Sequence, residues 1–185
     1  MSRDGDWMQT FTGKQFWPMD PRVDEVCIED ISHALSMQCR YAGHCTEFYS
    51  VAEHSVRVSC IVHARYAMWG LLHDASEAYL VDLPRPIKRY SALGDRYREI
   101  EDRLMLVIAA RFGLSDQEPS EVQDADNVML MTEKRDLMPN SPAKWRETSE
   151  PLAAVILPWI PAIAEQRFLR RYEHLLGDCG QSCPR

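Results

Sequence analysis

The sequence AMWGLLHDASEAYL at residues 67–80 decides the fold. Its apolar residues recur at helical spacing, which predicts one helix over this range. The helix is expected to end before the LPRP segment at residues 83–86, because proline has no backbone N–H with which to continue a helix. His73, Asp74 and Glu77 stand inside this apolar pattern, and such polar side chains are costly to bury without partners.

Similar patterns extend along the rest of the chain. Ser50-Val-Ala-Glu53 forms a capping box, in which the serine accepts from a backbone N–H and the glutamate reaches back. Gly113 is expected to end a long helix, because glycine adopts the left-handed conformation at low cost. The predicted helices start near residues 29, 51, 67, 90, 120 and 161. We find no alternating pattern typical of a strand, so the sequence predicts an all-α, compact bundle of about six or seven helices.

The length of 185 residues fits one domain with additions at its ends. Residues 1–28 contain Trp-Pro and Asp-Pro pairs that disfavour helix, and we expect an irregular segment packed on the domain. Residues 29–177 are expected to form the single domain. Residues 178–185 are polar and contain glycine, which predicts a disordered tail.

The charge and hydropathy of the chain limit the classes of function that fit it. Lys and Arg number 21 against 28 for Asp and Glu, and the resulting net charge of −7 disfavours binding to nucleic acid polymers. The most apolar stretch, residues 153–164, is too short to span a membrane and contains two prolines. The N-terminal residues show no secretory signal pattern and the six cysteines form no C-x-x-C pair, so we expect a cytoplasmic protein with free thiols.

The polar residues of the central helix indicate a metal site. His73 and Asp74 share one helical face with Glu77, because side chains three and four residues apart are neighbours. His54 lies in the preceding predicted helix, and consecutive helices with a short connection pack antiparallel, so His54 can face His73. Asp126 lies early in a later helix, beside an apolar run. A divalent cation would balance the charge of this cluster. The alternative for the His-Asp dipeptide is a simple hydrogen-bonded pair.

The two imidazoles and two carboxylates of His54, His73, Asp74 and Asp126 would form a mixed nitrogen and oxygen site. Such donors suit a divalent transition metal, Zn²⁺, Co²⁺, Mn²⁺ or Fe²⁺, better than Ca²⁺, and the residue types do not rank these metals. Four protein ligands also leave a coordination position for water.

The order and spacing of these residues resemble the H…HD…D signature of the HD-domain metal-dependent phosphohydrolases. The blocks that carry the similarity are IEDISHAL (28–35), CRYAGH (39–44), VAEHS (51–55), LHDASEA (72–78) and DLPRPIK (82–88). The last three resemble the 5′-deoxynucleotidase branch, and the first two look closest to phage-type enzymes that include dATP triphosphohydrolases. The resemblance covers roughly residues 28–137 and implies the helical HD-domain fold.

This resemblance implies roles for the residues around the cluster. The two histidines and two aspartates named above would hold the metal, and Glu77 would hold or deprotonate the attacking water. Asp82 is a second acid–base candidate, with an N-cap for the following turn as the alternative. Cleavage would break the bond between the α-phosphorus and the nucleoside 5′-oxygen, in a monophosphate or in a triphosphate alike.

Further residues of the matching blocks are candidates for substrate contacts. Arg40 would make bidentate contact with phosphate, because guanidinium matches its geometry. His44 and Lys88 are further candidates for binding phosphate. Tyr41 would stack on the base, with an ordinary core tyrosine as the alternative, and Pro86 would line the base pocket.

The resemblance thus favours an enzyme that converts dATP or related triphosphates to deoxynucleoside and triphosphate. A second Mg²⁺ ion would accompany such a substrate. The alternatives are a 5′-deoxynucleotidase acting on monophosphates and a nucleotide sensor without turnover. The expected partner is a small deoxynucleotide, and the enzymes that the chain resembles form homo-oligomers.

Overall fold

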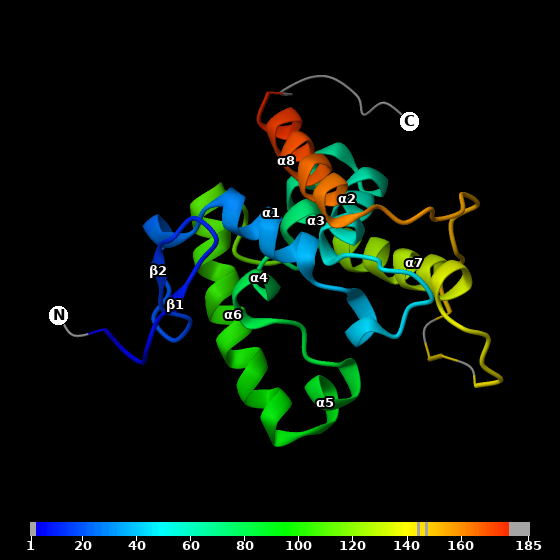
Figure 1. Ribbon diagram of the computed structural model, residues 1–185, viewed down its shortest axis with the longest axis horizontal. Helices are drawn as coiled ribbons and strands as arrows, with labels where there is room; N and C mark the ends of the chain where they lie inside the picture. Colours follow the sequence, from blue (N-terminus) through cyan, green and yellow to red (C-terminus); the bar gives the residue numbers. More distant parts are fainter. Residues whose placement is uncertain (1–2, 144, 147, 178–185) are drawn as a thin grey trace.

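The computed structural model describes residues 3–143, 145–146 and 148–177, and eight α-helices make up most of this part of the chain (Figure 1). In chain order, α1 to α8 span Ile28–Met37, Val51–Ile61, Ala67–Leu72, Glu77–Leu80, Arg85–Tyr90, Ala92–Phe112, Ser120–Leu137 and Pro161–Gly177. The expected all-α class is confirmed. None of the described helices has the length and apolar content needed to cross a lipid bilayer. The predicted tail, residues 178–185, lies outside the described residues.

A small antiparallel hairpin, β1 (Met8–Gln9) and β2 (Gln15–Phe16), precedes the helices. The expectation of no strand is therefore wrong for these four residues, because a two-residue strand is too short to carry an alternating pattern. Phe16 is fully buried and stacks on Tyr79, with 4.0 Å between the ring centres. The hairpin thus closes one end of the hydrophobic core.

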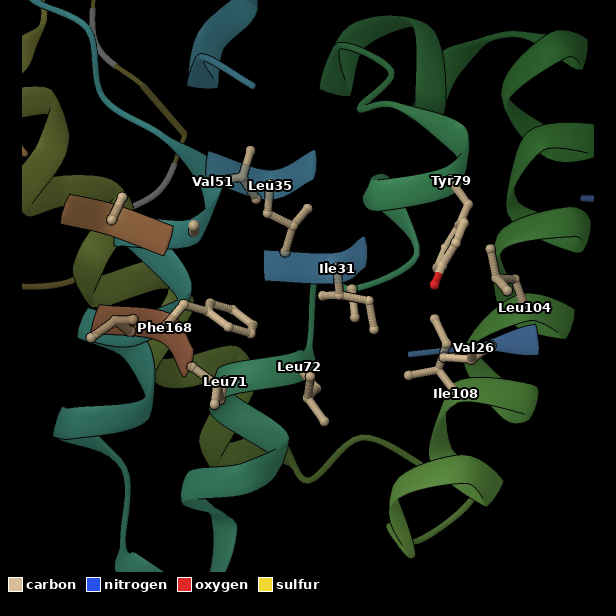
Figure 2. Packing of buried hydrophobic residues seen from close by; sticks show 14 of the residues in the cluster. Val26, Ile31, Leu35, Val51, Leu71, Leu72, Tyr79, Leu104, Ile108 and Phe168 are labelled. Atoms are coloured by element: carbon tan, nitrogen blue, oxygen red, sulfur yellow. The ribbon is translucent and has the colours of Figure 1, made fainter. Parts of the chain in front are cut away.

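Helix α2 lies at the centre of the bundle and packs against α1, α3, α7 and α8. The apolar faces of α1, α2, α3 and α8 meet in a core that also includes side chains of α6 (Figure 2). Its fully buried members include Ile31, Leu35, Leu71, Leu72, Leu104, Ile108 and Phe168. Because α2 is surrounded by other helices, four of its polar side chains, Glu53, His54, Ser55 and Ser59, are also removed from water.

The start of α2 shows one half of the predicted capping box. The Ser50 hydroxyl accepts a hydrogen bond from the Glu53 backbone N–H at 3.0 Å. The expected return bond is wrong, because the buried Glu53 carboxylate accepts from Arg57 and from the Trp159 backbone N–H instead. Gly113, with φ of +67°, ends α6 as predicted. Glu53 thus holds the segment that leads into α8.

The prediction of one helix over residues 67–80 is wrong. Helix α3 ends at Leu72, α4 begins at Glu77, and residues 73–76 form a turn between them. The His73 imidazole Nδ1 lies 2.9 Å from the Gly70 carbonyl oxygen and takes up an acceptor that a continuous helix would use. The Glu77 N–H then bonds to the Asp74 carbonyl three residues back. This break places the polar residues at a bend, where they face a pocket.

A six-residue helix, α5, occupies the segment in which two prolines were expected to stop helical structure. Proline is tolerated in a first turn, where its missing N–H would have no helical partner. α5 packs closely on α6, and a Cβ atom added at Gly94 would lie 2.2 Å from the Lys88 carbonyl oxygen. Glycine at this position therefore allows the contact that places Lys88 beside the pocket.

Candidate metal centre

Two imidazole rings meet at the interface of α2 with the end of α3. His54 is fully buried on α2, and its Nε2 lies 3.2 Å from Nε2 of His73. The other nitrogen of each ring faces an acceptor. His54 Nδ1 lies 2.5 Å from the Glu133 carboxylate, and His73 Nδ1 faces the Gly70 carbonyl. Because a carbonyl and an ionised carboxylate can only accept, each Nδ1 donates, and Nε2 of each ring is the nitrogen that faces the other ring and is placed to bind a cation.

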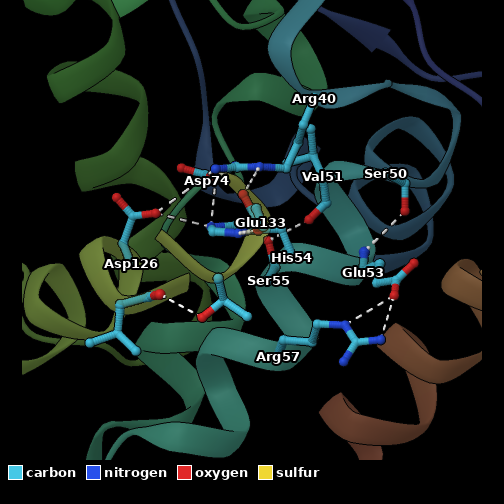
Figure 3. A network of polar contacts seen from close by, with 12 residues as sticks. Arg40, Ser50, Val51, Glu53, His54, Ser55, Arg57, Asp74, Asp126 and Glu133 are labelled. Carbon is cyan, nitrogen blue, oxygen red and sulfur yellow. Dashed lines mark hydrogen bonds and ion pairs between the residues drawn. The ribbon is translucent and has the colours of Figure 1, made fainter. Parts of the chain in front are cut away.

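Two carboxylates surround these facing nitrogens. Oδ2 of Asp74 lies 3.3 Å from His73 Nε2 and 3.8 Å from His54 Nε2. Oδ1 of Asp126, on α7, lies 3.2 Å from His54 Nε2 (Figure 3). His54, His73 and Asp74 each offer a ligand atom, and these atoms all lie within 4.8 Å of one another. These three side chains could hold a metal ion, with Asp126 approaching from the opposite helix.

The electrostatics of the cluster fit a cation at this point. Burial and the charge of Arg40 oppose a proton on His54, but the Glu133 charge and the contacts with Asp126 and Glu133 outweigh them and raise the pKa of His54 to about 9. Burial alone would raise the pKa of Asp126, but its hydrogen bond with His54 lowers it well below its usual range. The donors thus attract a positive charge between them, and two nitrogens with two carboxylates suit a divalent transition metal.

Arg40 lies against the acidic side of the cluster. It belongs to the short 3-10 turn Arg40–Gly43 and contacts three carboxylates at once. Its guanidinium nitrogens lie 3.3 Å from Asp74, 3.2 Å from Glu133 and 4.0 Å from Asp126 (Figure 3). The predicted phosphate-binding arginine therefore stands next to the predicted ligands, with its charge shared among them.

Glu77 is the first residue of the short helix α4, and Asp82 follows the end of this helix. Glu77 is 6% exposed, and its Oε2 is buried without a hydrogen-bond partner among the described residues. Burial, followed by the charges of Asp74 and Asp82, raises the pKa of Glu77 well above its usual range. Asp82 is exposed, directly after Val81, whose φ of +65° is rare for a β-branched residue. Both predicted acid–base residues are thus close enough to interact with Asp74.

The predicted substrate contacts occupy different positions. The Lys88 ammonium pairs with Glu101 at 2.6 Å and lines a pocket beside the metal cluster. Tyr41 donates its hydroxyl to Glu133 at 2.5 Å, and its ring lies 6.0 Å from that of Trp145. His44 and Pro86 are exposed, the latter on α5. Stacking of Tyr41 on a base and the contacts expected of His44 and Pro86 stay predictions.

The pocket has a volume of about 390 Å³ and opens from the metal cluster, whose residues His73, Asp74 and Asp126 form part of its lining. One wall is apolar and includes Trp69, Met105 and Leu106. The lining outside the cluster also contains four acidic residues, Glu101, Asp102, Asp116 and Glu118, and one lysine, Lys88. The pocket can therefore hold a small molecule with one end at the cluster and an apolar surface along its side.

Glu133 is the functional-site residue that the sequence analysis missed. It is fully buried on α7 and accepts from Arg40, Tyr41 and His54. Its position seven residues after Asp126 places it two turns further along the same helical face. That spacing is a signal in the sequence that points to a second carboxylate facing α2.

Comparison with known proteins adds to this picture. No family model matches the chain. The chain is 37% identical to the uncharacterized protein YfdR of Escherichia coli over 173 residues, which cover 91% of this chain and 95% of YfdR. It is also similar to two 5′-deoxynucleotidases, PBPRA2627 of Photobacterium profundum at 32% identity and YfbR of E. coli at 33%. Those matches of 92 residues cover 40% of this chain and less than half of either enzyme. The length and identity of the first match show that the chain belongs to the family of YfdR.

Proposed function

We propose that this chain is a metal-dependent phosphohydrolase of the HD-domain type that removes the 5′-phosphate from deoxynucleoside monophosphates. The observation that carries the proposal is the pair of imidazole Nε2 atoms 3.2 Å apart, flanked by two carboxylates at the end of a pocket. The partial similarity to 5′-deoxynucleotidases supports the same reaction class.

The ligands of the metal would be His54, His73, Asp74 and Asp126. When bound, a divalent ion such as Zn²⁺, Co²⁺, Mn²⁺ or Fe²⁺ polarises a phosphoryl oxygen and acidifies water. The chain supplies the remaining groups of the reaction. Arg40 already stands against the ligand carboxylates, and its planar guanidinium is suited to a phosphate that arrives beside them.

Glu77 is the group that we propose as the base. Its carboxylate is buried next to Asp74, and one of its oxygens has no protein partner among the described residues. A carboxylate oxygen without a protein partner can accept a proton from a water held beside Asp74. Glu77 would take a proton from the attacking water, while exposed Asp82 is placed to exchange protons with solvent or with the departing 5′-oxygen. The bond that breaks joins that oxygen to phosphorus.

The charge of the pocket favours a monophosphate over a triphosphate. Four carboxylates beyond the cluster face the pocket, and Lys88 is already paired with one of them, Glu101. Two additional phosphates would therefore meet an acidic wall and would need a second cation such as Mg²⁺. The nucleoside of a monophosphate carries no charge and offers hydroxyl and amino donors to the same carboxylates. We therefore rank the 5′-deoxynucleotidase activity above dATP triphosphohydrolase activity.

The experiment that tests the proposal is a substrate panel. The chain is incubated with Zn²⁺, Co²⁺, Mn²⁺ or Fe²⁺ and with dAMP, dGMP, dCMP, dTMP, AMP or dATP, and the products are separated by chromatography. We expect deoxynucleoside and phosphate from the deoxy monophosphates. Release of triphosphate from dATP alone would replace the monophosphatase by the triphosphohydrolase. Binding without any product would favour a nucleotide sensor.

A substitution at Glu77 tests its role as the base, and a substitution at the exposed Asp124 is the matched control. Glu77→Gln keeps the shape of the side chain but removes its capacity to accept the proton, so we expect loss of turnover with nearly unchanged metal content by elemental analysis. Asp124→Asn changes an exposed acid on α7 and should leave both properties unaltered. An active Glu77→Gln chain would move the base role to Asp82 or to solvent.

A further inference from the structure

Glu133 is a buried charge whose partners are divided between its two oxygens. Its Oε2 accepts from the Arg40 Nε at 3.2 Å and from the Tyr41 hydroxyl at 2.5 Å. Its Oε1 lies 2.5 Å from His54 Nδ1 (Figure 3). The side chain is completely shielded from solvent. One oxygen is thus fixed by two donors, and the other is left for the histidine.

We infer that Glu133 is a positioning residue of the metal site, which fixes the proton of His54 on Nδ1 and so directs the Nε2 lone pair toward the cation. This inference rests on the metal site proposed above. An ionised carboxylate has no proton to donate, so its short contact with Nδ1 requires that this nitrogen carry the hydrogen. The tautomer then leaves Nε2 free to coordinate, and the same hydrogen bond fixes the orientation of the ring.

Arg40 and Tyr41 determine which oxygen of Glu133 accepts the hydrogen bond from His54. Both donors lie on Oε2, and the Arg40 guanidinium has no acceptor, so only an oxygen can face it. Rotation of the carboxylate is therefore restrained on one side by two bonds. Arg40 also brings a positive charge that compensates the burial of Glu133. The residues predicted to contact substrate thus also act through Glu133 on a metal ligand.

The division of partners predicts a specific effect of Glu133→Gln. The amide oxygen of the new side chain must face Arg40, which can only donate, and this turns its NH₂ group toward His54. Nδ1 then has to accept, and the proton of the neutral ring moves to Nε2, where it points at the cation. The substitution is nearly isosteric, and it changes the tautomer of His54 while it also removes the charge that pairs with Arg40. We expect the affinity for Zn²⁺ to fall about 10- to 100-fold, as for other groups that orient a metal-bound histidine.

The test measures Zn²⁺ affinity by competition with a chelator, and the protonation of the histidine nitrogens by ¹⁵N NMR. The wild-type chain loaded with Zn²⁺ should show a proton on His54 Nδ1 and none on Nε2. Glu133→Gln should lower the affinity and remove the Nδ1 proton signal. Tyr41→Phe, which leaves the carboxylate in place, should keep the signal and lose less affinity. Asp124→Asn, on the same helix and exposed, should match the wild type.

Wild-type affinity in a folded Glu133→Gln chain would overturn the inference. If that variant does not fold, the wild-type spectrum still decides, because a proton on His54 Nε2 in the Zn²⁺-loaded chain contradicts the proposed role. A chain that binds Zn²⁺ with the expected tautomer but hydrolyses no nucleotide would refute the proposed function and leave the role of Glu133 intact. A chain that binds no metal would refute both.

Discussion

Asp74→Asn keeps the shape of its side chain but removes one of the two carboxylate charges proposed to hold the metal. A cation that binds only the folded chain stabilises it by about 4.1 kcal/mol at a concentration 1,000 times its Kd. For a chain of 185 residues, 1 kcal/mol changes Tm by about 2–4 °C. Saturating metal should therefore raise the Tm of the wild-type chain by about 8–16 °C.

The substituted chain should respond much less. If the loss of this charge weakens binding 100-fold, the same metal concentration contributes only about 1.4 kcal/mol, which corresponds to a rise of about 3–6 °C. Without metal the two chains should unfold at similar temperatures. Asp74 is 3.3 Å from Arg40, but its charge also raises the pKa of Glu77, so favourable and unfavourable contacts are lost together.

Scanning calorimetry after dialysis against a chelator, with and without added Zn²⁺, Co²⁺ or Mn²⁺, measures both effects. Asp124→Asn is the control, because it removes an exposed carboxylate from α7 and should leave the metal-dependent rise in Tm unchanged. The reasoning is refuted if none of the metals changes the wild-type Tm, or if Asp74→Asn gains as much stability as the wild type does.

Three more substitutions test two charges and one packing contact around the site. Arg40→Gln removes a positive charge within 4.0 Å of two proposed ligand oxygens, and its repulsion of a bound cation is worth at most about 4 kcal/mol at intermediate polarity. Metal titration should therefore show tighter binding, by about tenfold, while kcat/KM falls about 100-fold. Glu118→Gln relieves repulsion in the pocket, and the ratio of dATP to dAMP hydrolysis should rise about fivefold, for about 1 kcal/mol. Gly94→Ala places a methyl group against the Lys88 carbonyl, and chemical denaturation should show a loss of about 1–3 kcal/mol or more. Weaker metal binding by Arg40→Gln would contradict the first prediction. An unchanged ratio of dATP to dAMP hydrolysis in Glu118→Gln would contradict the second, and unchanged stability of Gly94→Ala the third.

The helical class and the meeting of the two histidines could be predicted from the sequence. Both depend on local patterns, the spacing of apolar residues and the short connection between consecutive helices. His54 and His73 are only 19 residues apart, and antiparallel packing of α2 on α3 is enough to bring their Nε2 atoms to 3.2 Å. Prediction succeeds where one periodicity and one turn determine the geometry.

The break between α3 and α4 could not be predicted in the same way. The apolar pattern of residues 67–80 continues through the break, so periodicity alone favours one helix. At the break, the His73 side chain bonds to the Gly70 carbonyl, and its Nε2 contacts His54 on α2. The local structure is thus decided by tertiary contacts. The half-formed capping box has the same origin, since Glu53 is occupied by Trp159, far along the chain.

The network around Glu133 shows more clearly which contacts local sequence patterns do not predict. Arg40 and Glu133 are separated by 93 residues, and no local pattern pairs an arginine in a 3-10 turn with a carboxylate at the far end of α7. Yet the helical period does place Glu133 on the same face as Asp126. If one acid on that face approaches His54 Nε2, a second acid two turns away is well placed to approach its Nδ1. A single helix, α7, therefore contacts both nitrogens of the His54 imidazole, Nε2 through Asp126 and Nδ1 through Glu133. Substituting either acid should alter the same histidine at a different nitrogen, because Asp126 contacts the nitrogen proposed to bind metal and Glu133 the nitrogen that carries the proton.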